Sequence, residues 1–311
     1  MQRRIAIRLQ FKPHIYHCCM NTCIAFTNNF TDLAACPVCG EPCYSHGKPQ
    51  AIFEYLPVIP HLQALYESPK MIKTMLYHEN HGHVPGEYSD IFNGSHYWML
   101  MQTDLVVEGL QYDRKSFDCS TDIALGLISD GVQVCKKPQG GNVTAWPIFC
   151  LNYNIPPELR VHSNYLIALG IAPGPCQPSD HNSFLYPFYC ELIMLGHGVS
   201  TWNTKMREHF LLRAHLLTKL GDMQAIKYNQ YIKGPNAFSP CWCCRLQGCH
   251  DPNASSTNYY LPLTSPEGAV RIDFSPGYNW DPWSLPLRTD EECQQAILYI
   301  QAGMTVTEQK H

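Results

Sequence analysis

Two aspartates stand where apolar runs end, a position in which carboxylates are typical of metal-dependent nuclease sites. Asp130 follows IALGLIS, and Asp222 follows HLLTKLG. Two-metal phosphodiester chemistry uses carboxylates from separate strands, because Mg²⁺ takes oxygen ligands and ions about 4 Å apart contact the attacking and leaving oxygens. Asp130 and Asp222 are therefore candidate ligands for Mg²⁺ or Mn²⁺. Each has a structural alternative: Asp130 with Gly131 also suits a turn, and Asp222 also suits a helix cap.

Closely spaced cysteines form the second chemical pattern. Four lie at the spacing of two chelating loops: Cys19, Cys23, Cys36 and Cys39. Such a set can close a tetrahedral zinc shell, which is usually structural because four thiolates leave no position for a substrate. Cys18 and Cys43 flank the set and are alternative ligands. Buried free thiols are the other interpretation.

Sixteen cysteines in 311 residues raise the question of disulfides. The N-terminal MQRRIAIRLQFK does not resemble a secretory signal, because Arg8 and Lys12 interrupt its apolar stretch, and no run of about 18 apolar residues spans a bilayer. We therefore expect no membrane partner and reducing conditions, under which zinc is favoured over disulfides. The formal net charge of −4 gives no global basic field, so any nucleic-acid contact must be local.

Four apolar runs and one helix are expected to position the aspartates. DIALGLIS, AWPIFCLNYN and RVHSNYLIALGIAPG predict three strands, of which the first two can form a hairpin. SDHNSFLYPFYCELIMLGHGV predicts an amphipathic helix capped by Ser179 or Asp180, and HFLLRAHLLTKLGD predicts a fourth strand. This order is that of a ribonuclease H-like fold, in which the first and fourth strands are neighbours. Asp130 and Asp222 would then face each other.

The region before these strands carries helical and histidine-rich patterns. PHLQALYESPKMIKTMLY predicts two short helices separated at Pro69. His78, His81 and His83 lie beside Gly82, which favours a solvated loop over a metal site.

Several blocks of sequence, in order, carry a family resemblance. They include GKPQAIFEYLPVIPHLQALYESP, LGLISDGV, WPIFCLNYNIPPELR, FLYPFYCELIMLGHGV, FLLRAHLLTKLGDMQA, KGPNAFSPCWCCRLQG and LPLRTDEE. Together these blocks resemble the transposases of CACTA (En/Spm) DNA transposons, in particular the fungal branch called Plavaka. The resemblance extends from about Tyr16 to Gln294.

The resemblance implies a DDE/D transposase, in which metal-bound acids cut DNA at the element ends and the freed 3′-OH attacks target DNA. Asp130 in ISDGV matches the first catalytic acid, and Asp222 in LGDMQA matches the second. Cys241 and Cys244 match the zinc-type CxxC that follows the second acid. Further candidate ligands for that zinc are Cys243, Cys249 and His250. DNA as the partner, a nuclear location and a possible homo-oligomer are implied as well.

The family pattern also has a third acid, a glutamate on a helix downstream of the LPLRT segment. Glu291, Glu292 and Glu308 do not fit that pattern and are expected on a solvated helical face. The chain is therefore expected to be a truncated, catalytically incomplete transposase. Two alternatives stay open: a noncatalytic zinc module that binds DNA or protein, and a decayed fragment without function.

The expected organisation is a mixed α+β and α/β chain with four parts. These are a zinc-ribbon-like module (1–48), a helical or irregular connecting region (49–112), a partial ribonuclease H-like core (113–240), and a CxxC segment with a C-terminal extension (241–311).

Overall fold

The computed structural model describes residues 12–221, except 83, 85 and 137–141, together with parts of the segment 239–298. The described parts of that segment are 239–241, 243–246, 248, 263–264, 279–289, 291–292, 294–295 and 298. The chain divides into two compact units, Met1–Ala225 and Ile226–His311, each of which is taken by itself below. Within the described ranges, no helix combines the length and apolar character needed to cross a membrane.

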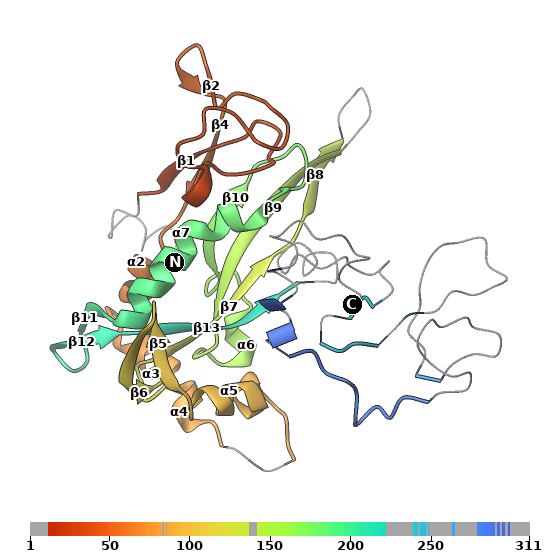
Figure 1. Ribbon diagram of the computed structural model, residues 1–311. Helices are drawn as coiled ribbons and strands as arrows, with labels where there is room; N and C mark the ends of the chain where they lie inside the picture. The colour runs from red at the N-terminus through yellow and green to blue at the C-terminus, as the bar shows by residue number, and fades with distance from the viewer. Residues whose placement is uncertain are drawn as a thin grey trace. The chain divides into compact units, whose positions relative to one another are not determined.

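A seven-stranded mixed sheet forms the centre of the first unit (Figure 1). Its order is β1-β4-β10-β9-β7-β13, and β8 pairs with β9 beside this path. The strands are β1 His14–Cys18, β4 Ala51–Tyr55, β7 Ile123–Ser129, β8 Val132–Lys136, β9 Asn142–Asn152, β10 Ile167–Ala172 and β13 Ala214–Leu220. Neighbouring strands are antiparallel, except that β7 and β13 are parallel. The sheet and its helices confirm the predicted mixed α/β class.

The burial of β7 agrees with its position inside the sheet. Ile123, Leu125 and Leu127 of β7 are almost completely buried, as expected for a central strand covered on both faces. The predicted hairpin partner is present as β9, which pairs antiparallel with β7, and the third predicted strand is β10. A parallel pair requires a crossover, and the chain passes through β9, β10 and α7 (His181–His197) between β7 and β13.

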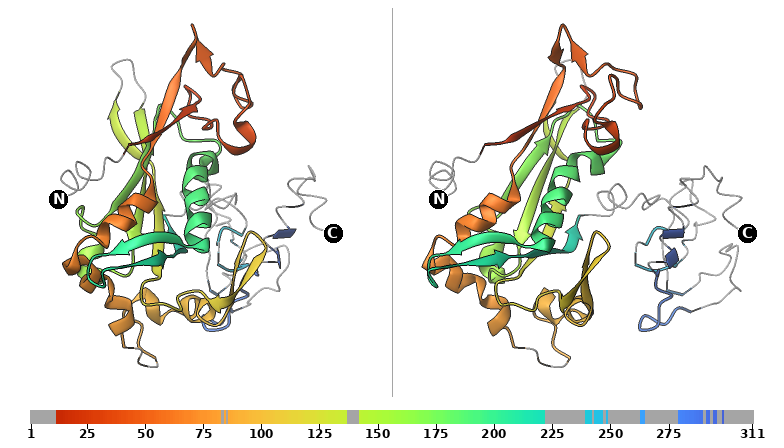
Figure 2. Two further views of the ribbon diagram at one scale, coloured as in Figure 1. Left: turned by 90° about the vertical axis from the view of Figure 1, so that its left-hand side faces the viewer. Right: turned by 60° about the vertical axis from the view of Figure 1, so that its left-hand side comes forward.

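Helix α7 packs along one face of the sheet (Figure 2). Its N-cap is Asp180, one of the two predicted caps. The Asp180 side chain accepts a hydrogen bond from the backbone N–H of Ser183. Phe184 on the buried side of the helix meets Phe53 of β4 edge-on, with ring centroids 5.3 Å apart. The predicted amphipathic helix is therefore confirmed, with its apolar stripe against the strands.

The remaining helices are short. They are η1 Asn28–Phe30, α2 Val58–Leu65, α3 Pro69–Met75, α4 Tyr77–Asn80, η2 Ile91–Asn93, α5 Ser95–Leu100 and α6 Pro157–Arg160. Pro69 does separate two helices, as predicted, because it occupies the first position of α3 behind the N-cap Ser68. The predicted solvated histidine loop is wrong for His78, which lies in α4, half-buried and hydrogen-bonded to Asn154. His81 is also half-buried and bonded, whereas His83 lies outside the described residues.

Three two-stranded hairpins are present that the sequence did not predict. They are β2 Tyr44–Ser45 with β3 Lys48–Pro49, β5 Asp104–Val107 with β6 Leu110–Lys115, and β11 Val199–Asn203 with β12 Glu208–Leu212. The run HFLLRAHLLTKLGD was expected to be one strand, but Arg213 divides it into β12 and β13. The first half pairs back onto β11, so only β13 enters the main sheet.

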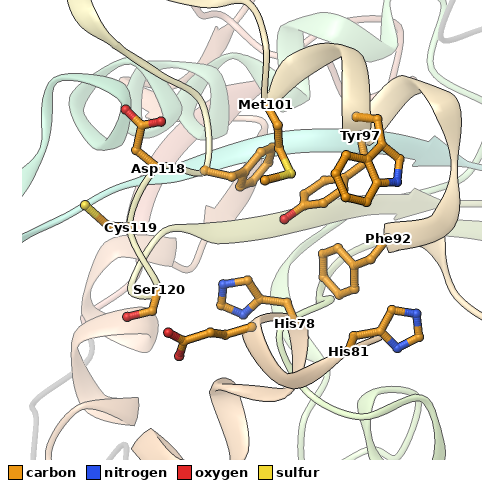
Figure 3. A pocket seen from close by; sticks show the side chains of 11 residues that line it. His78, His81, Phe92, Tyr97, Met101, Asp118, Cys119 and Ser120 are labelled. Atoms are coloured by element: carbon orange, nitrogen blue, oxygen red, sulfur yellow. The ribbon is translucent and has the colours of Figure 1, made fainter. Parts of the chain in front are cut away.

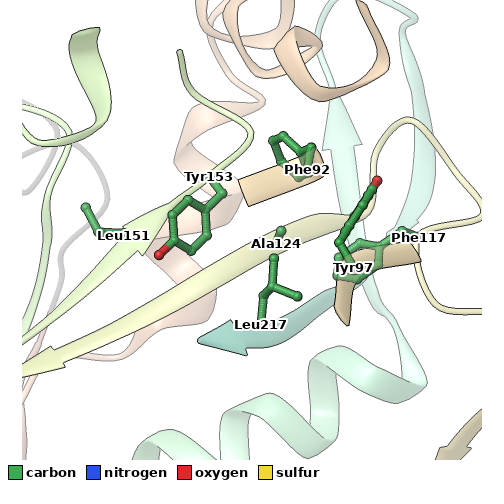
Figure 4. Close-up of a cluster of buried hydrophobic side chains, with 7 residues drawn as sticks. All are labelled: Phe92, Tyr97, Phe117, Ala124, Leu151, Tyr153 and Leu217. Atoms are coloured by element: carbon green, nitrogen blue, oxygen red, sulfur yellow. The ribbon is translucent and has the colours of Figure 1, made fainter. Parts of the chain in front are cut away.

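A cluster of buried side chains joins the sheet to the short helices (Figure 4). Its members are Phe92, Tyr97, Phe117, Ala124, Leu151, Tyr153 and Leu217. Phe92, Tyr97 and Phe117 come from η2, α5 and the segment after β6. Ala124 and Leu217 come from β7 and β13, and Leu151 and Tyr153 come from the end of β9 and the residue after it. The strands that carry the candidate aspartates are thereby anchored well inside the core.

Candidate functional site

Four cysteines come together in the loops between β1 and β4, beyond the end of β1 and before the start of β4. The Sγ atoms of Cys19, Cys23, Cys36 and Cys39 all lie within 4.8 Å of one another. Cys19 and Cys23 belong to the loop that follows β1, and Cys36 and Cys39 belong to a second tight loop. Within the described part of the chain, these four form the one group of three or more such side chains that could hold a metal ion.

Local backbone geometry explains why this sequence forms two chelating loops. The N–H of Thr22 donates to the carbonyl of Cys19 at 2.8 Å, and the N–H of Gly40 donates to that of Cys36 at 2.9 Å. Gly40 has φ +77°, a left-handed conformation that glycine adopts without steric cost. Both turns bring the two sulfurs of each loop to the same side.

The donor set fits zinc. A Zn–S bond of about 2.3 Å in a tetrahedron separates the sulfurs by about 3.8 Å, and the Sγ atoms of Cys19 and Cys39 are 3.4 Å apart. Cys18 and Cys43, the alternative ligands, are buried but do not belong to the group. Such a site would be structural, because four thiolates leave zinc no open position.

The environment of the sulfurs is uneven. Hydrogen bonds from the backbone of Glu41 and then from the side chain of Asn21 lower the pKa of the exposed Cys39 thiol to about 6. Burial raises the pKa of the Cys19 and Cys23 thiols. Cys39 therefore ionises readily, whereas the three buried thiols do not. A bound cation would offset the cost of ionising those three.

The cysteine loops are also tied to helix α7. The backbone N–H groups of Ser179 and Asp180 both donate to the carbonyl of Cys23 at 2.9 Å. Ser183 Oγ accepts a hydrogen bond from the N–H of Ala25 at 2.9 Å. The cluster is therefore continuous with the N-terminal end of the helix that covers the sheet.

The second candidate site lies where β7 and β13 leave the sheet. Their parallel register pairs Ile128 with Leu220. Asp130 stands two residues beyond Ile128, and Asp222 stands two residues beyond Leu220 in the sequence. Parallel strands end at the same edge of a sheet, so β7 carries its aspartate at the edge where β13 ends. Asp222 itself lies outside the described residues.

Asp130 is exposed at that edge. Its Oδ1 accepts a hydrogen bond of 2.7 Å from the backbone N–H of Gly131, so the turn that the sequence also suggested is present. A Cβ atom at position 131 would lie 2.7 Å from Cζ2 of Trp146, so only glycine fits against that indole ring. The exit of the chain from β7 is therefore sterically fixed.

Two contacts between side chains of β9, α7 and β13 were missed by sequence reasoning. Lys219 precedes the last residue of β13, and its Nζ donates to the hydroxyl of Tyr189 in α7 at 2.8 Å. Burial lowers the pKa of Lys219. His181 is buried beside Trp146, with ring centroids 5.9 Å apart, and neither ring nitrogen has a hydrogen-bond partner in the described structure. Lys219 stands in the same KLGD run as the second aspartate, which was the available signal.

The CxxC pair belongs to the second unit. The backbone N–H of Cys244 donates to Sγ of Cys241 at 3.4 Å, a short-loop geometry like that of the first set. Arg288 holds this loop, because its Nε donates to the carbonyl of Cys241 at 3.0 Å. Cys243 is exposed, and Cys249 and His250 lie outside the described residues.

The late glutamates that the structure describes are exposed, as expected. Glu292 Oε2 accepts from the N–H of Thr289 at 3.1 Å, and the N–H of Glu292 donates to Thr289 Oγ1 at 3.3 Å, which forms a capping box. Glu292 also pairs with Arg245 at 2.8 Å. Glu291 is exposed as well, and Glu308 lies outside the described residues.

A comparison with protein families bears on this arrangement. The model of the transposase family tnp2 matches residues 109–261. The tnp2 match spans β6 to β13 and includes the positions of Asp130, Asp222, Cys241 and Cys244, whereas the four-cysteine cluster precedes it. No curated protein and no solved structure matches the chain. The transposase family match supports a transposase-derived protein.

Proposed function

We propose that this chain contains the ribonuclease H-like core of a DDE/D transposase of the CACTA type, in its Plavaka-like branch. The tnp2 match supports the general part of this proposal. The topology supports the fold: β10, β9 and β7 are successive antiparallel neighbours, α7 follows, and β13 then lies parallel to β7. That is the order of strands and helix expected from the sequence for a ribonuclease H-like core.

One observation carries the catalytic part of the proposal, the register between β7 and β13. Because Ile128 is paired with Leu220, the two aspartates follow their strands at equal distance from a paired position. Equal spacing beyond a parallel pair favours two carboxylates that converge at one edge. Carboxylate oxygens are the ligands that Mg²⁺ and Mn²⁺ prefer.

Asp130 and Asp222 would hold Mg²⁺ or Mn²⁺, which when bound activates the attacking oxygen and stabilises the leaving oxygen of a phosphodiester. The steric fit of Gly131 against Trp146 would fix where the Asp130 carboxylate leaves the sheet. Strand transfer requires a third carboxylate in this scheme. Glu292 is a poor candidate, because its carboxylate already caps Thr289 and pairs with Arg245.

Zinc would have a separate, structural role. We assign it to Cys19, Cys23, Cys36 and Cys39, which make the N-terminal region a zinc-ribbon-like module, with Cys241 and Cys244 as half of another site. Soft thiolates suit zinc and hard carboxylates suit Mg²⁺ or Mn²⁺, so the two kinds of metal would not compete. DNA is the partner proposed on family resemblance, with the nucleus as the compartment and homo-oligomerisation as a further possibility.

Binding of Mn²⁺, followed by electron paramagnetic resonance, tests the catalytic assignment without requiring turnover. Wild-type protein should bind Mn²⁺, and Asp130→Asn and Asp222→Asn should each weaken its affinity at least about tenfold. The matched control is Asp113→Asn, since Asp113 is an exposed aspartate of β6. Equal affinities for all four proteins would refute the assignment of the two acids.

A noncatalytic zinc module that binds DNA or protein is the second candidate, and the cysteine cluster favours it. A closed thiolate set builds structure and does not depend on the aspartates. This candidate predicts zinc in the purified protein and DNA binding that Asp130→Asn leaves unchanged, with no Mn²⁺ bound at that residue.

A further inference from the structure

A cavity of about 320 Å³ lies among α4, η2, α5 and the segment after β6 (Figure 3). One wall is aromatic and is formed by Phe92, Tyr97, Trp98 and Phe117. The rest of the lining combines Met101 and two half-buried histidines with exposed side chains, among them Glu79 and Asp118. The volume is at the lower end for ligand pockets, so the cavity suits one side chain or a small group.

The aromatic wall is held in place by its own packing. The ring centroid of Tyr97 is 4.9 Å from that of Phe92 and 5.1 Å from that of Phe117. These three residues are at most 6% exposed and belong to the buried cluster shown in Figure 4. A ligand would therefore meet a preformed wall and would not have to order it.

The hydroxyl of Tyr97 adds an electronegative oxygen to the cavity. Tyr97 is 6% exposed, yet its hydroxyl has no hydrogen-bond partner among the described residues. Figure 3 shows this oxygen directed into the space between Phe92 and His78. A hydroxyl oxygen that faces a cavity without a protein partner can contact the methyl groups of a bound ammonium, which carry part of its positive charge.

The charged residues of the lining favour a ligand of positive charge. Glu79 makes no ion pair with any described residue, and Asp118 lies 4.0 Å from Nε of Arg114 while it accepts from the backbone N–H of Lys115. No lysine or arginine is among the described lining residues, and burial lowers the pKa of His78. Glu79 therefore leaves a negative charge without an ion-pair partner at the cavity, whereas Arg114 offsets part of the charge of Asp118.

The geometry points to a binding site for a methylated ammonium group, carried on a lysine side chain of a partner protein. Aromatic faces attract cations, and methylated ammonium groups are bound by such cages. An unmodified ammonium is strongly hydrated and loses more on entering an aromatic site. Glu79 and Asp118 supply the complementary charge at the mouth, where the partner's backbone would remain. This inference does not rest on the proposed transposase chemistry.

Calorimetric titration with a short Gly/Ser peptide containing trimethyllysine tests the site. The same peptide with a neutral tert-butyl isostere should bind about tenfold more weakly, because it has the same shape without the charge. Unmodified lysine should also bind more weakly. Tetramethylammonium chloride separates the sources: equal affinity for it and for the peptide would contradict a lysine-bearing partner.

Substitution of two lining residues tests whether the peptide binds in the cavity. Glu79→Gln should weaken binding about threefold and Trp98→Leu about tenfold, with thermal unfolding used to verify the fold. Glu67→Gln is the control, since Glu67 is exposed outside the cavity. Equal binding of the isostere, or equal effects of Glu79→Gln and Glu67→Gln, would overturn the proposal. So would a single-stranded oligonucleotide that binds through Trp98 when the trimethyllysine peptide does not.

Discussion

Leu220 of β13 lies directly opposite Ile128 of β7, in the one parallel pair of the described central sheet. This pairing determines which sequence positions arrive together at the sheet edge. A slip of one residue would turn every side chain of β13 to the other face, so the buried residues of both strands fix the register. The proposed pairing of Asp130 with Asp222 depends on that register.

Zinc content should follow the four clustered cysteines. Cys36→Ser removes one ligand from a tetrahedral set, so the protein should lose one equivalent of zinc in a colorimetric release assay. Cys43→Ala should retain it, because Cys43 is buried nearby but outside the group. Unchanged zinc in Cys36→Ser, or loss in Cys43→Ala, would show that the ligand set is different.

Glu191 should contribute strongly to stability. Its carboxylate accepts from the Tyr55 hydroxyl and from the backbone N–H groups of Val58 at 2.7 Å and Ile59 at 3.1 Å, so it connects α7 to β4 and to the first turn of α2. Glu191→Leu leaves these donors unsatisfied and should lower the free energy of unfolding by about 2–4 kcal/mol in urea denaturation. Glu54→Leu changes an exposed carboxylate of β4 and should cost less than about 0.5 kcal/mol. Similar losses in both variants would argue against the Glu191 contacts.

Gly170 should not tolerate a side chain. It adopts φ +155° at the irregularity in β10, and an added Cβ would lie 2.6 Å from the carbonyl oxygen of Glu54. Gly170→Ala should therefore destabilise the protein by about 2–4 kcal/mol, measured as a lower midpoint in urea. Gly82→Ala, which would have nothing within 4 Å, is the control and should stay near wild type. A stable Gly170→Ala protein would mean that β10 and β4 are not so close.

Stability should fall in mild acid because of two histidines, the buried His181 and the half-buried His215. Burial lowers the pKa of His181 and of His215 to about 4, whereas histidine in an unfolded chain titrates near 6.5. Between these values the unfolded state binds more protons, so stability is lost as pH falls from about 6.5 to about 4. The loss should reach up to about 3 kcal/mol for each histidine.

His181→Leu should remove one part of this pH dependence, seen as the difference from wild type in urea denaturation at each pH. His162→Gln replaces an exposed histidine and should leave the pH profile unchanged. A constant difference between His181→Leu and wild type across the window would contradict a neutral buried imidazole.

The parts of the fold that sequence could predict are those with local, repeated signals. Asp180 predicts the start of α7, because its side chain caps the helix within one turn. The short cysteine spacings predict a cluster, because each loop is closed by its own backbone turn. The long apolar run of β7 marks a central strand for the same reason.

What remained hidden depends on distant contacts. The hairpins β5–β6 and β11–β12 are short and carry exposed polar residues, so their alternation is weak in the sequence. The break at Arg213 is invisible because apolar residues flank it on both sides. The aromatic cavity unites residues from α4 to the segment after β6, and no spacing rule connects His78 with Phe117.

The most direct test is the distance between the Asp130 and Asp222 carboxylates, measured in a crystal structure grown with Mn²⁺. Oxygens of both residues should coordinate the same ion or two ions about 4 Å apart, visible by anomalous scattering. Carboxylates separated by more than about 8 Å, beyond the reach of a shared metal pair, would contradict it.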